Sequence, residues 1–299
     1  MNFSKILKRY RVDKPGKFRL SSIDPGDTCG IDCEKDEHKQ QMAKDIKHLA
    51  ELQELLYAEN RWAVLAIFQA MDAAGKDGVI SHVMSGVNPQ GCEVYAFKAP
   101  SAEELDHDFL WRSARRIPER GRIGIFNRSY YEETLVVRVH PELLEKQKLP
   151  EHLAGKDIWK ERFKSIRAFE RHLARNGTKV VKFHLRISRE EQRQRFLDRL
   201  EEPAKRWKFS MGDVAERGLW DKYQAAWQDA IHNTATAYAP WYVVPADHKW
   251  FARVVISSTI VQALEKLDPK FPHVDKKASP EYERVRRALV AEGPKKADK

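Results

Sequence analysis

The chain has 299 residues, of which 42% are hydrophobic and 33% are charged, and it carries a net charge of +10. This size and composition suffice for one large α/β domain or two small ones. They exclude a membrane-spanning helix, because no stretch approaches the roughly 20 consecutive apolar residues that a bilayer requires. The first nine residues lack the apolar run of a signal peptide, so we expect a cytoplasmic location. The excess of positive charge favours a polyanionic partner.

The predicted elements begin with an extended arm at residues 1–34, followed by a folded domain at 35–268 and a basic tail at 269–299. Apolar runs predict strands at 62–68, 93–98, 121–126, 180–185 and 241–245. Helical patterns lie between and around these runs, at 36–58, 101–116, 157–175, 219–236 and 249–267, and from 79 and 189 onward. This alternation predicts an α/β fold with a five-stranded parallel sheet and helices on both faces.

The loop after the first predicted strand has the composition of a phosphate-binding loop. Small residues and a Gly75-Lys76 pair separate the strand from the next helix. Backbone N–H groups can surround phosphate oxygens only where side chains are small, and a helix N-terminus adds positive potential. A lysine there reaches the outer phosphates. The candidate phosphate-binding residues of the loop are Ala73, Ala74, Gly75, Lys76, Asp77 and Gly78.

This loop departs from the usual G-x-x-x-x-G-K-[ST] pattern in two places. Ala70 stands at the first glycine, and Asp77 replaces the Ser/Thr whose hydroxyl normally holds Mg²⁺. The carboxylate of Asp72 lies inside the loop and is a good Mg²⁺ ligand. The alternative interpretation is a helix-opening turn with a surface lysine, and the pattern alone favours neither.

A second motif follows the third predicted strand, which ends at Asn127 and Arg128. An apolar strand that ends in a polar residue resembles the Walker B element, which faces the phosphate loop. Arg128 is suited to a bidentate contact with phosphate. Glu132 and Glu133 lie one turn further on, where the alternative is a solvated helix face.

A third group of basic residues predicts a lid at about 189–220. Arg189 and Arg193 are four residues apart and share a helix face. The same group contains Arg195 and Arg199, and Lys205 and Lys208 follow in an irregular segment. Closure of such a lid would exclude water and neutralise phosphate charge. A solvated basic face is the alternative, since several Glu residues are interspersed.

Taken together, these motifs resemble the polyphosphate kinase 2 family over roughly residues 15–268. The matching segments are 65–78, 82–91, 104–112, 126–133, 203–210 and 236–245. The resemblance implies a P-loop, thymidylate-kinase-like core with a helical lid. It implies reversible phosphoryl transfer between inorganic polyphosphate and AMP, ADP or ATP with Mg²⁺, or Mn²⁺ in its place.

The resemblance also implies roles for individual residues. Asp72, Lys76 and Arg128 would be catalytic, and Asp72 and Glu133 would hold the metal. Further contacts to nucleotide or phosphate would come from the loop residues and from Asn88, Arg112, Asn127, Glu132, Arg189, Arg193, Lys205 and Lys208. Family members commonly form dimers or tetramers, so we expect a homo-oligomer.

The segment after Arg128 bears on the acceptor. Members that act only on nucleoside diphosphates tend to read F-D-R-S-W-Y-N, whereas this chain has Glu132 in place of the final Asn. It therefore resembles the branch that accepts both AMP and ADP.

Two other functions fit parts of the sequence. An ATP-dependent nucleoside monophosphate kinase would share the fold and differ in the donor. A nucleic-acid-binding module would use the basic charge, but the sequence has no recognisable binding motif and the loop would then be unexplained. We expect neither a nucleic-acid nor a membrane partner.

Overall fold

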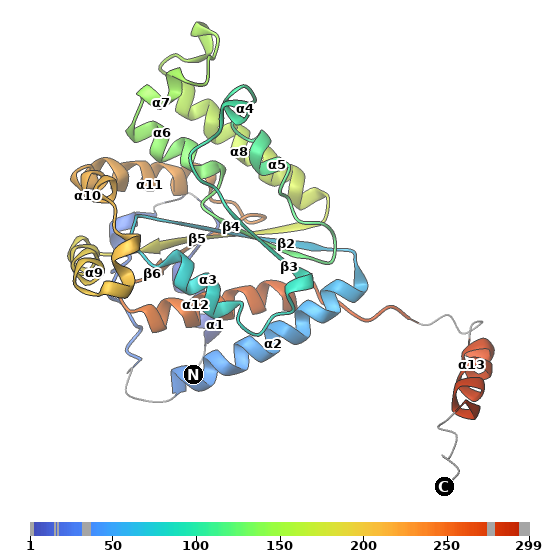
Figure 1. Cartoon of the computed structure of the whole chain (residues 1–299). Coiled ribbons are helices and arrows are strands. Elements are labelled where there is room, and N and C mark those ends of the chain that lie inside the picture. The colour runs from blue at the N-terminus through green and yellow to red at the C-terminus, as the bar shows by residue number, and fades with distance from the viewer. Residues whose placement is uncertain (1–2, 15, 17, 32–36, 274–278, 293–299) are drawn as a thin grey trace.

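The computed structural model describes residues 3–14, 16, 18–31, 37–273 and 279–292. A central sheet lies between two layers of helices, and the C-terminal helix α13 (Ser279–Ala291) stands apart from this body (Figure 1). Residues 32–36, with the predicted boundary at 34, and part of the tail lie outside the described residues. Within the described ranges, no helix combines the length and apolarity needed to cross a bilayer.

The sheet has six strands in the order β1-β6-β5-β2-β4-β3. β2, β3, β4, β5 and β6 pair in parallel, and β1 pairs antiparallel with β6 at one edge. The central strands are built from apolar residues that helices cover on both sides, as parallel strands require. The strands are β1 (Arg11–Val12), β2 (Ala63–Ala70), β3 (Cys92–Ala96), β4 (Ile123–Asn127), β5 (Thr178–Arg186) and β6 (Trp241–Pro245).

Helices cover both faces of the sheet. On one face, α12 packs against α2 and α3, and α12 is buried along most of its length. On the other face, α8 packs on β5, and α11 contacts both α6 and α8 (Figure 1). The longer helices are α1 (Phe3–Tyr10), α2 (Glu37–Glu59), α3 (Lys76–Val83), α8 (Ile158–Arg175), α9 (Arg189–Glu201), α10 (Met211–Gly218), α11 (Trp220–Thr234) and α12 (Lys249–Glu265).

Short helical segments fill the connections. The α-helical ones are α4 (Ala102–Leu105), α5 (Trp111–Ala114), α6 (Val136–Val139) and α7 (Glu142–Glu145). The 3₁₀ segments are η1 (Leu20–Ser22), η2 (Pro89–Gly91), η3 (Tyr130–Thr134), η4 (Glu151–Leu153) and η5 (Pro203–Lys208).

The prediction of five strands is wrong because the N-terminal arm is not simply extended. Residues 3–10 form α1, and the two residues after it add β1 to the sheet. This part of the arm packs against the folded domain because Leu7, Tyr10 and Val12 are buried in the core. A two-residue strand is too short to give a period-two pattern, so the sequence held little signal for it.

The single helix predicted at 101–116 is also wrong, since the structure has α4 and α5 with a break between them. Ser101 caps the first helix and forms a capping box with Glu104. The helix ends at Asp106, and the Asp108 carboxylate accepts a hydrogen bond from the backbone N–H of Leu110 at 2.9 Å. A side chain that bonds its neighbouring backbone in this way competes with the helical hydrogen bond.

Candidate functional site

The phosphate loop leaves β2 and enters α3 at the carboxyl edge of the sheet. Ala73 has φ of +63° and Gly75 has φ of +95°, so the chain turns sharply on small residues. The Nζ of Lys76 folds back and donates to the carbonyl oxygen of Ala70 at 3.0 Å. Across the loop, the Asn127 amide donates to Asp77 Oδ1 at 2.6 Å. The predicted loop and strand-end residues therefore do meet.

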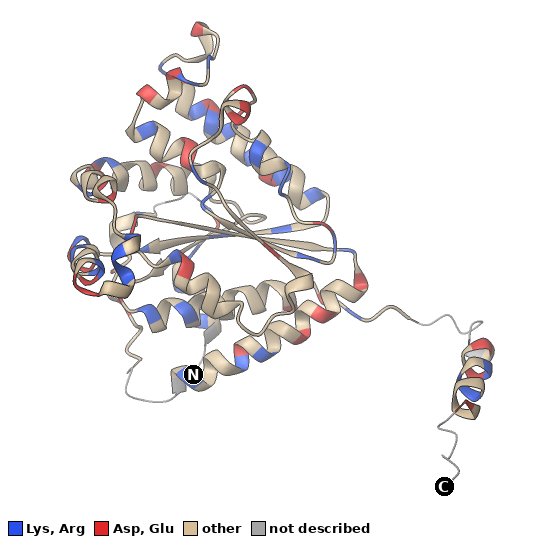
Figure 2. Cartoon of the chain, viewed as in Figure 1, with Lys and Arg blue, Asp and Glu red and all other residues tan. Residues whose placement is uncertain are grey.

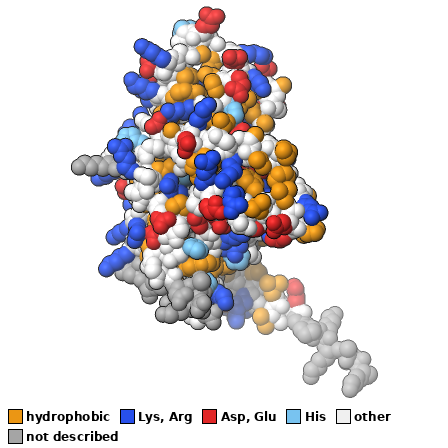
Figure 3. All heavy atoms as spheres, turned by 90° about the vertical axis from the view of Figure 1, so that its left-hand side faces the viewer, with side chains coloured by type: hydrophobic (Ala, Val, Ile, Leu, Met, Phe, Trp, Pro, Cys, Tyr) orange, Lys and Arg blue, Asp and Glu red, His pale blue; other side chains and the backbone are white. Residues whose placement is uncertain are grey.

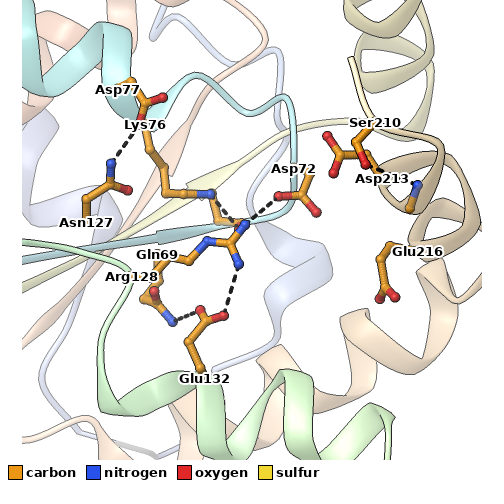
Figure 4. A network of polar contacts seen from close by, with 12 residues as sticks. Gln69, Asp72, Lys76, Asp77, Asn127, Arg128, Glu132, Ser210, Asp213 and Glu216 are labelled. Atoms are coloured by element: carbon orange, nitrogen blue, oxygen red, sulfur yellow. Dashed lines mark hydrogen bonds and ion pairs between the residues drawn. The ribbon is translucent and has the colours of Figure 1, made fainter. Parts of the chain in front are cut away.

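Arg128 is the centre of a chain of polar contacts (Figure 4). Its Nη2 donates to Asp72 Oδ1 at 3.0 Å, and its Nη1 lies 3.4 Å from Glu132 Oε2. The other oxygen of Glu132 accepts from Gln69 Nε2 at 2.9 Å. Asp213 of α10 lies on the far side of Asp72 (Figure 4). One arginine thus joins the loop from β2 to the segment that follows β4.

The charged groups around Arg128 shift one another's pKa values. Burial works to lower the pKa of Arg128, but Glu132 and Asp72 outweigh it and hold that pKa above its ordinary value. Burial lowers the pKa of Lys76, although Asp72 opposes the shift. Burial and the neighbouring Asp72 carboxylate raise the pKa of Asp213. Additional negative charge from a phosphate would stabilise the protonated form of Lys76.

A first cavity of about 640 Å³ opens above the phosphate loop. Nine Lys or Arg residues and only three Asp residues line it. Figure 2 shows basic residues on α9, on the segment after it and on the start of α12, and Figure 3 looks onto this side of the molecule. The cationic residues of the lining are Lys76, Lys98, Arg128, Arg195, Arg199, Lys205, Lys208, Lys249 and Arg253.

A second cavity of about 320 Å³ lies on the other side of Arg128. Its wall is largely apolar, and Lys98, Ala99 and Arg128 belong to both cavities. Predicted residue Arg112 lies here, where its Nη2 donates to the carbonyl oxygen of Lys98 at 2.6 Å. The apolar part of the wall comprises Leu105, Phe109, Tyr130, Val136, Val137 and Leu143.

Most of the predicted site residues come together around these two cavities. The first cavity is lined by Asp72, Ala73, Ala74, Gly75, Lys76, Asp77, Gly78, Asn127, Arg128, Lys205 and Lys208, and the second by Arg112, Arg128, Glu132 and Glu133. The remaining three, Asn88, Arg189 and Arg193, lie elsewhere.

Asn88 lies at the opposite edge of the sheet. It caps η2, accepting a hydrogen bond from the backbone N–H of Gln90, and η2 leads into the first residue of β3. The amino end of a parallel strand is the edge away from the phosphate loop. Asn88 instead borders a groove beside α2, so its predicted contact with nucleotide or phosphate is not supported.

Arg189 and Arg193 project from the wrong side of α9. Arg193 is exposed and pairs with Glu190, while Arg189 borders a separate cavity near the N-terminal arm. The inward side of this helix is marked by the buried Phe196. Arg195 and Arg199, also four residues apart, line the first cavity instead. The four-residue spacing therefore indicated correctly that one pair of arginines on this helix lines the site. That pair is Arg195 and Arg199, not the predicted Arg189 and Arg193.

Glu133 is held away from the phosphate loop by its partners. Its Oε1 accepts from Arg162 Nε at 2.8 Å and its Oε2 accepts from Gln147 Nε2 at 2.7 Å. Burial raises the pKa of Glu133, although Arg162 opposes the shift. With both oxygens engaged, Glu133 supports the wall of the second cavity, whereas Asp72 lines the first, so the two predicted metal ligands face different cavities.

Besides Lys98, four basic residues of the first cavity were not among the individual site residues predicted, although Arg195 and Arg199 belong to the basic group from which the lid was predicted. Arg195, Arg199, Lys249 and Arg253 come from the inward side of α9 and from the start of α12. Lys249 and Arg253 are four residues apart and directly follow β6, so the rule that ligands bind beyond strand ends gave a usable signal. Burial and the positive charges of Arg195 and Lys205 lower the pKa of Lys249, as expected for a crowded anion site.

A strand, a phosphate loop and a helix, with two cavities beyond the strand ends, define a P-loop kinase. The model of the family described as polyphosphate kinase 2 matches residues 32–272, and the chain belongs to this family. The resemblance found in the sequence is confirmed.

Relatives cover nearly the whole chain. An "ADP-polyphosphate phosphotransferase" of Rhodopseudomonas palustris is 52% identical, over 95% of this chain and 98% of its own. An "AMP/ADP-polyphosphate phosphotransferase" of Meiothermus ruber is 46% identical, over 89% and 96%. A crystal structure of polyphosphate kinase 2 from Arthrobacter aurescens TC1 is 40% identical, covers 98% of both chains and matches with a TM-score of 0.86.

Proposed function

We propose that this protein transfers phosphoryl groups reversibly between inorganic polyphosphate and nucleotides, converting AMP to ADP and ADP to ATP. The observation that carries the proposal is the meeting of two different cavities at Lys98 and Arg128. A chain of phosphates needs many cations, whereas a nucleotide also needs an apolar slot for its base. We assign polyphosphate to the first cavity and the acceptor nucleotide to the second.

The lining of the first cavity argues against ATP as the donor. Phe97 is the one aromatic side chain among the described residues that line it. Binding of an adenine base would be served by more apolar or aromatic surface than this. The nine basic residues instead suit a long polyanion.

Phosphoryl transfer requires mainly positioning and charge neutralisation, so no covalent intermediate with the protein is needed. In this assignment, Lys76 and the backbone N–H groups of the loop hold the terminal phosphates of the donor. Arg128 borders both cavities and would contact the group in transit. Lys205 and Lys208 would hold the rest of the chain from the lid side.

The residues present fit Mg²⁺, or Mn²⁺, held jointly by protein and phosphate. No cluster of three or more His, Cys, Asp or Glu that could hold a metal occurs within the described ranges. Asp72 engages Arg128 through Oδ1, and its Oδ2 has no such contact with Arg128. Mg²⁺ commonly takes one or two carboxylates and completes its shell with phosphates and water. When bound, it would neutralise developing charge on the phosphates.

The two relatives above carry names that differ in the acceptor. We therefore base the proposed acceptor range on Glu132. Glu132 lines the second cavity and is held by both Gln69 and Arg128. Its negative charge would repel the second phosphate of ADP or recruit a metal ion or water in its place. We infer that this feature allows AMP to be accepted along with ADP.

The test is a nucleotide assay by chromatography with purified protein and Mg²⁺. AMP or ADP is supplied with either polyphosphate or ATP as the donor. ADP and then ATP should appear from AMP with polyphosphate alone, and a chelator should abolish both. Product from ADP only would remove the interpretation of Glu132, and product with ATP only would make the protein an ordinary nucleotide kinase.

A further inference from the structure

Arg195 lines the first cavity, yet its guanidinium is fully engaged by the protein. Its side chain is 6% exposed, and an arginine has five N–H donors. The Nε donates to Glu191 at 2.7 Å, and Nη1 donates to the carbonyl oxygens of Ala73 and Ala74 at 3.1 and 2.9 Å. The Nη2 donates to the carbonyl oxygens of Ala246 and Asp247 at 2.6 and 3.0 Å. No donor is left over for a phosphate.

These contacts fix the orientation of the phosphate loop. The C=O and N–H of one trans peptide unit point in opposite directions. When Arg195 holds the carbonyl oxygens of Ala73 and Ala74, the N–H of the following residue in each unit is turned away from it. For the second unit this is the N–H of Gly75, at the start of α3. The N–H of Ala74, in the first unit, donates to the carbonyl oxygen of Met71 at 3.3 Å. Arg195 therefore favours the loop conformation in which the N–H of Gly75 is available to an anion.

The loop needs such a support because it is strained. Ala73 adopts φ of +63°, a conformation that costs a residue with a side chain on the order of 1 kcal/mol or more. Buried carbonyl oxygens without partners would also be costly. Arg195 supplies charge-assisted hydrogen bonds to this segment and offsets both costs.

Arg195 also joins the loop to a second strand end. Ala246 and Asp247 follow β6, so one side chain spans the ends of β2 and β6, which lie on either side of β5. On the same helix, Gln192 Nε2 donates to the carbonyl oxygen of Asp72 at 3.0 Å. The first half of α9 is thus fixed to the phosphate loop, and the lid that can move would be shorter than predicted, at about 203–218.

We propose that Arg195 is a positioning residue that holds the phosphate loop in its anion-binding conformation without contacting substrate. The inference rests on the proposed function for its kinetic consequence. When a mutation displaces the groups that hold the substrate by about 1 Å, the rate of the chemical step can fall about 100-fold. The effect should fall on kcat and on the KM for polyphosphate, while the KM for AMP should not change because the second cavity does not include Arg195.

The decisive variant is Arg195→Lys, since it keeps the charge but loses the planar fork of donors. If Arg195 acted by attracting phosphate, this variant would retain most of its activity, and the proposal would be overturned. If Arg195 positions the loop, kcat should fall about 100-fold. The kcat of Arg195→Ala should fall at least as far, and millimolar guanidinium should partly restore it. Arg193→Ala is the matched control, because that arginine is exposed on the same helix.

A second readout does not depend on turnover. Amide hydrogen exchange of the peptide containing residues 72–78 should be at least tenfold faster in Arg195→Lys than in the wild type and unchanged in Arg193→Ala. Equal exchange in all three proteins would overturn the proposal. If the wild type fails to use polyphosphate at all, the proposed function fails, but the exchange comparison still decides the role of Arg195.

Discussion

The two cavities that meet at Arg128 differ in the residues that line them. The first is formed by the phosphate loop, by the inward side of α9 and by the start of α12, and its lining is dominated by positive charge. The second is formed by the segments after β3 and β4, and apolar side chains provide most of its exposed wall, although charged residues of both signs also line it. Charge selects a polyanion of any length, whereas an apolar slot selects a base by its shape. Substitutions in one cavity should therefore leave binding in the other unchanged.

The contacts that hold the walls of the two cavities differ as well. In the first cavity, hydrogen bonds from Arg195 to backbone carbonyl oxygens hold the phosphate loop. The second includes Tyr130, whose hydroxyl donates to Glu170 Oε1 at 3.0 Å in the core. Lys182 Nζ donates to Glu170 Oε2 at 2.7 Å, and both side chains are 0% exposed. Burial raises the pKa of Glu170, although Lys182 opposes the shift. An ion pair removed from water thus underlies the wall of the second cavity.

The largest expected effect on activity comes from Lys76→Ala. Because Lys76 would hold the donor's transferring end, its loss should lower kcat by about 10³-fold or more. Stopped assays with polyphosphate and AMP measure this rate. Lys164→Ala is the control, since Lys164 is exposed and pairs only with its neighbour Glu161. Turnover of Lys76→Ala close to that of the control would contradict the assignment of the loop.

The largest expected effect on stability comes from Lys182→Met. This change leaves the Glu170 carboxylate buried without its cation, which typically costs about 3–5 kcal/mol. Urea unfolding measures the loss. The double variant Lys182→Met/Glu170→Gln should recover much of it because no charge then remains buried. An unfolding midpoint of Lys182→Met equal to that of the wild type would refute the role of the pair.

A more moderate effect is expected from Lys208→Ala in the first cavity. The KM for polyphosphate should rise several-fold, because one cation on the lid side is worth on the order of 1 kcal/mol. The increase should shrink at high salt, where exposed charges are screened. The KM for AMP should stay constant. A parallel rise in both values would show that the two cavities are not independent.

Glu132→Asn sharpens the comparison from the acceptor side. Removal of the charge should shift preference from AMP toward ADP, by up to about tenfold in the ratio of kcat/KM values. Gln69 can still hydrogen-bond an Asn side chain, so the local structure should persist. Parallel assays with the two acceptors measure the ratio, and an unchanged ratio would remove Glu132 as a determinant.

The smallest effect concerns His140, which joins the segment after β4 to α10. It lies after α6 of the acceptor side and pairs with Glu216 of α10 at 2.9 Å, with Glu142 also in contact and Tyr223 bonded to Glu216. The hydrogen bond to Glu216 raises the pKa of His140, and burial opposes the shift. Because the pKa of His140 is higher in the folded state than in the unfolded state, its pairing stabilises the fold below about pH 6.5. This stabilisation is lost as the pH rises through the pKa of the folded state.

The measurement for His140 is the difference in Tm between pH 6 and pH 8. It should be larger in the wild type than in His140→Gln, by the small amount expected for a partly exposed pair. Identical differences in both proteins would show that the pair does not titrate in this range.

The sequence predicted the core of the fold because long apolar runs and helical periodicity leave little choice. β2 and the loop to Lys76 carried both signals and were predicted correctly. β1 was missed because two residues give no pattern, and its order depends on burial of Tyr10 against a distant helix. The break between α4 and α5 depends on local side-chain hydrogen bonds of Asp108, which compete closely with a helix.

The site was predicted where its residues follow a strand end directly. Asp72, Lys76 and Arg128 all do so, and topology brings strand ends together. Residues on the long α9 were harder, because four arginines there lie within eleven residues and only packing decides which face inward. Arg195 in particular gave no signal for its role, since its partners are carbonyl oxygens at two distant strand ends.

The central claim is that donor and acceptor occupy separate cavities and meet at Arg128. Initial rates of AMP phosphorylation, with polyphosphate and AMP varied together, test it most directly. Separate cavities that fill at the same time predict a family of intersecting lines in the double-reciprocal plot. Parallel lines, or competitive inhibition of AMP by polyphosphate, would mean that the two ligands take turns in one site and would contradict the account.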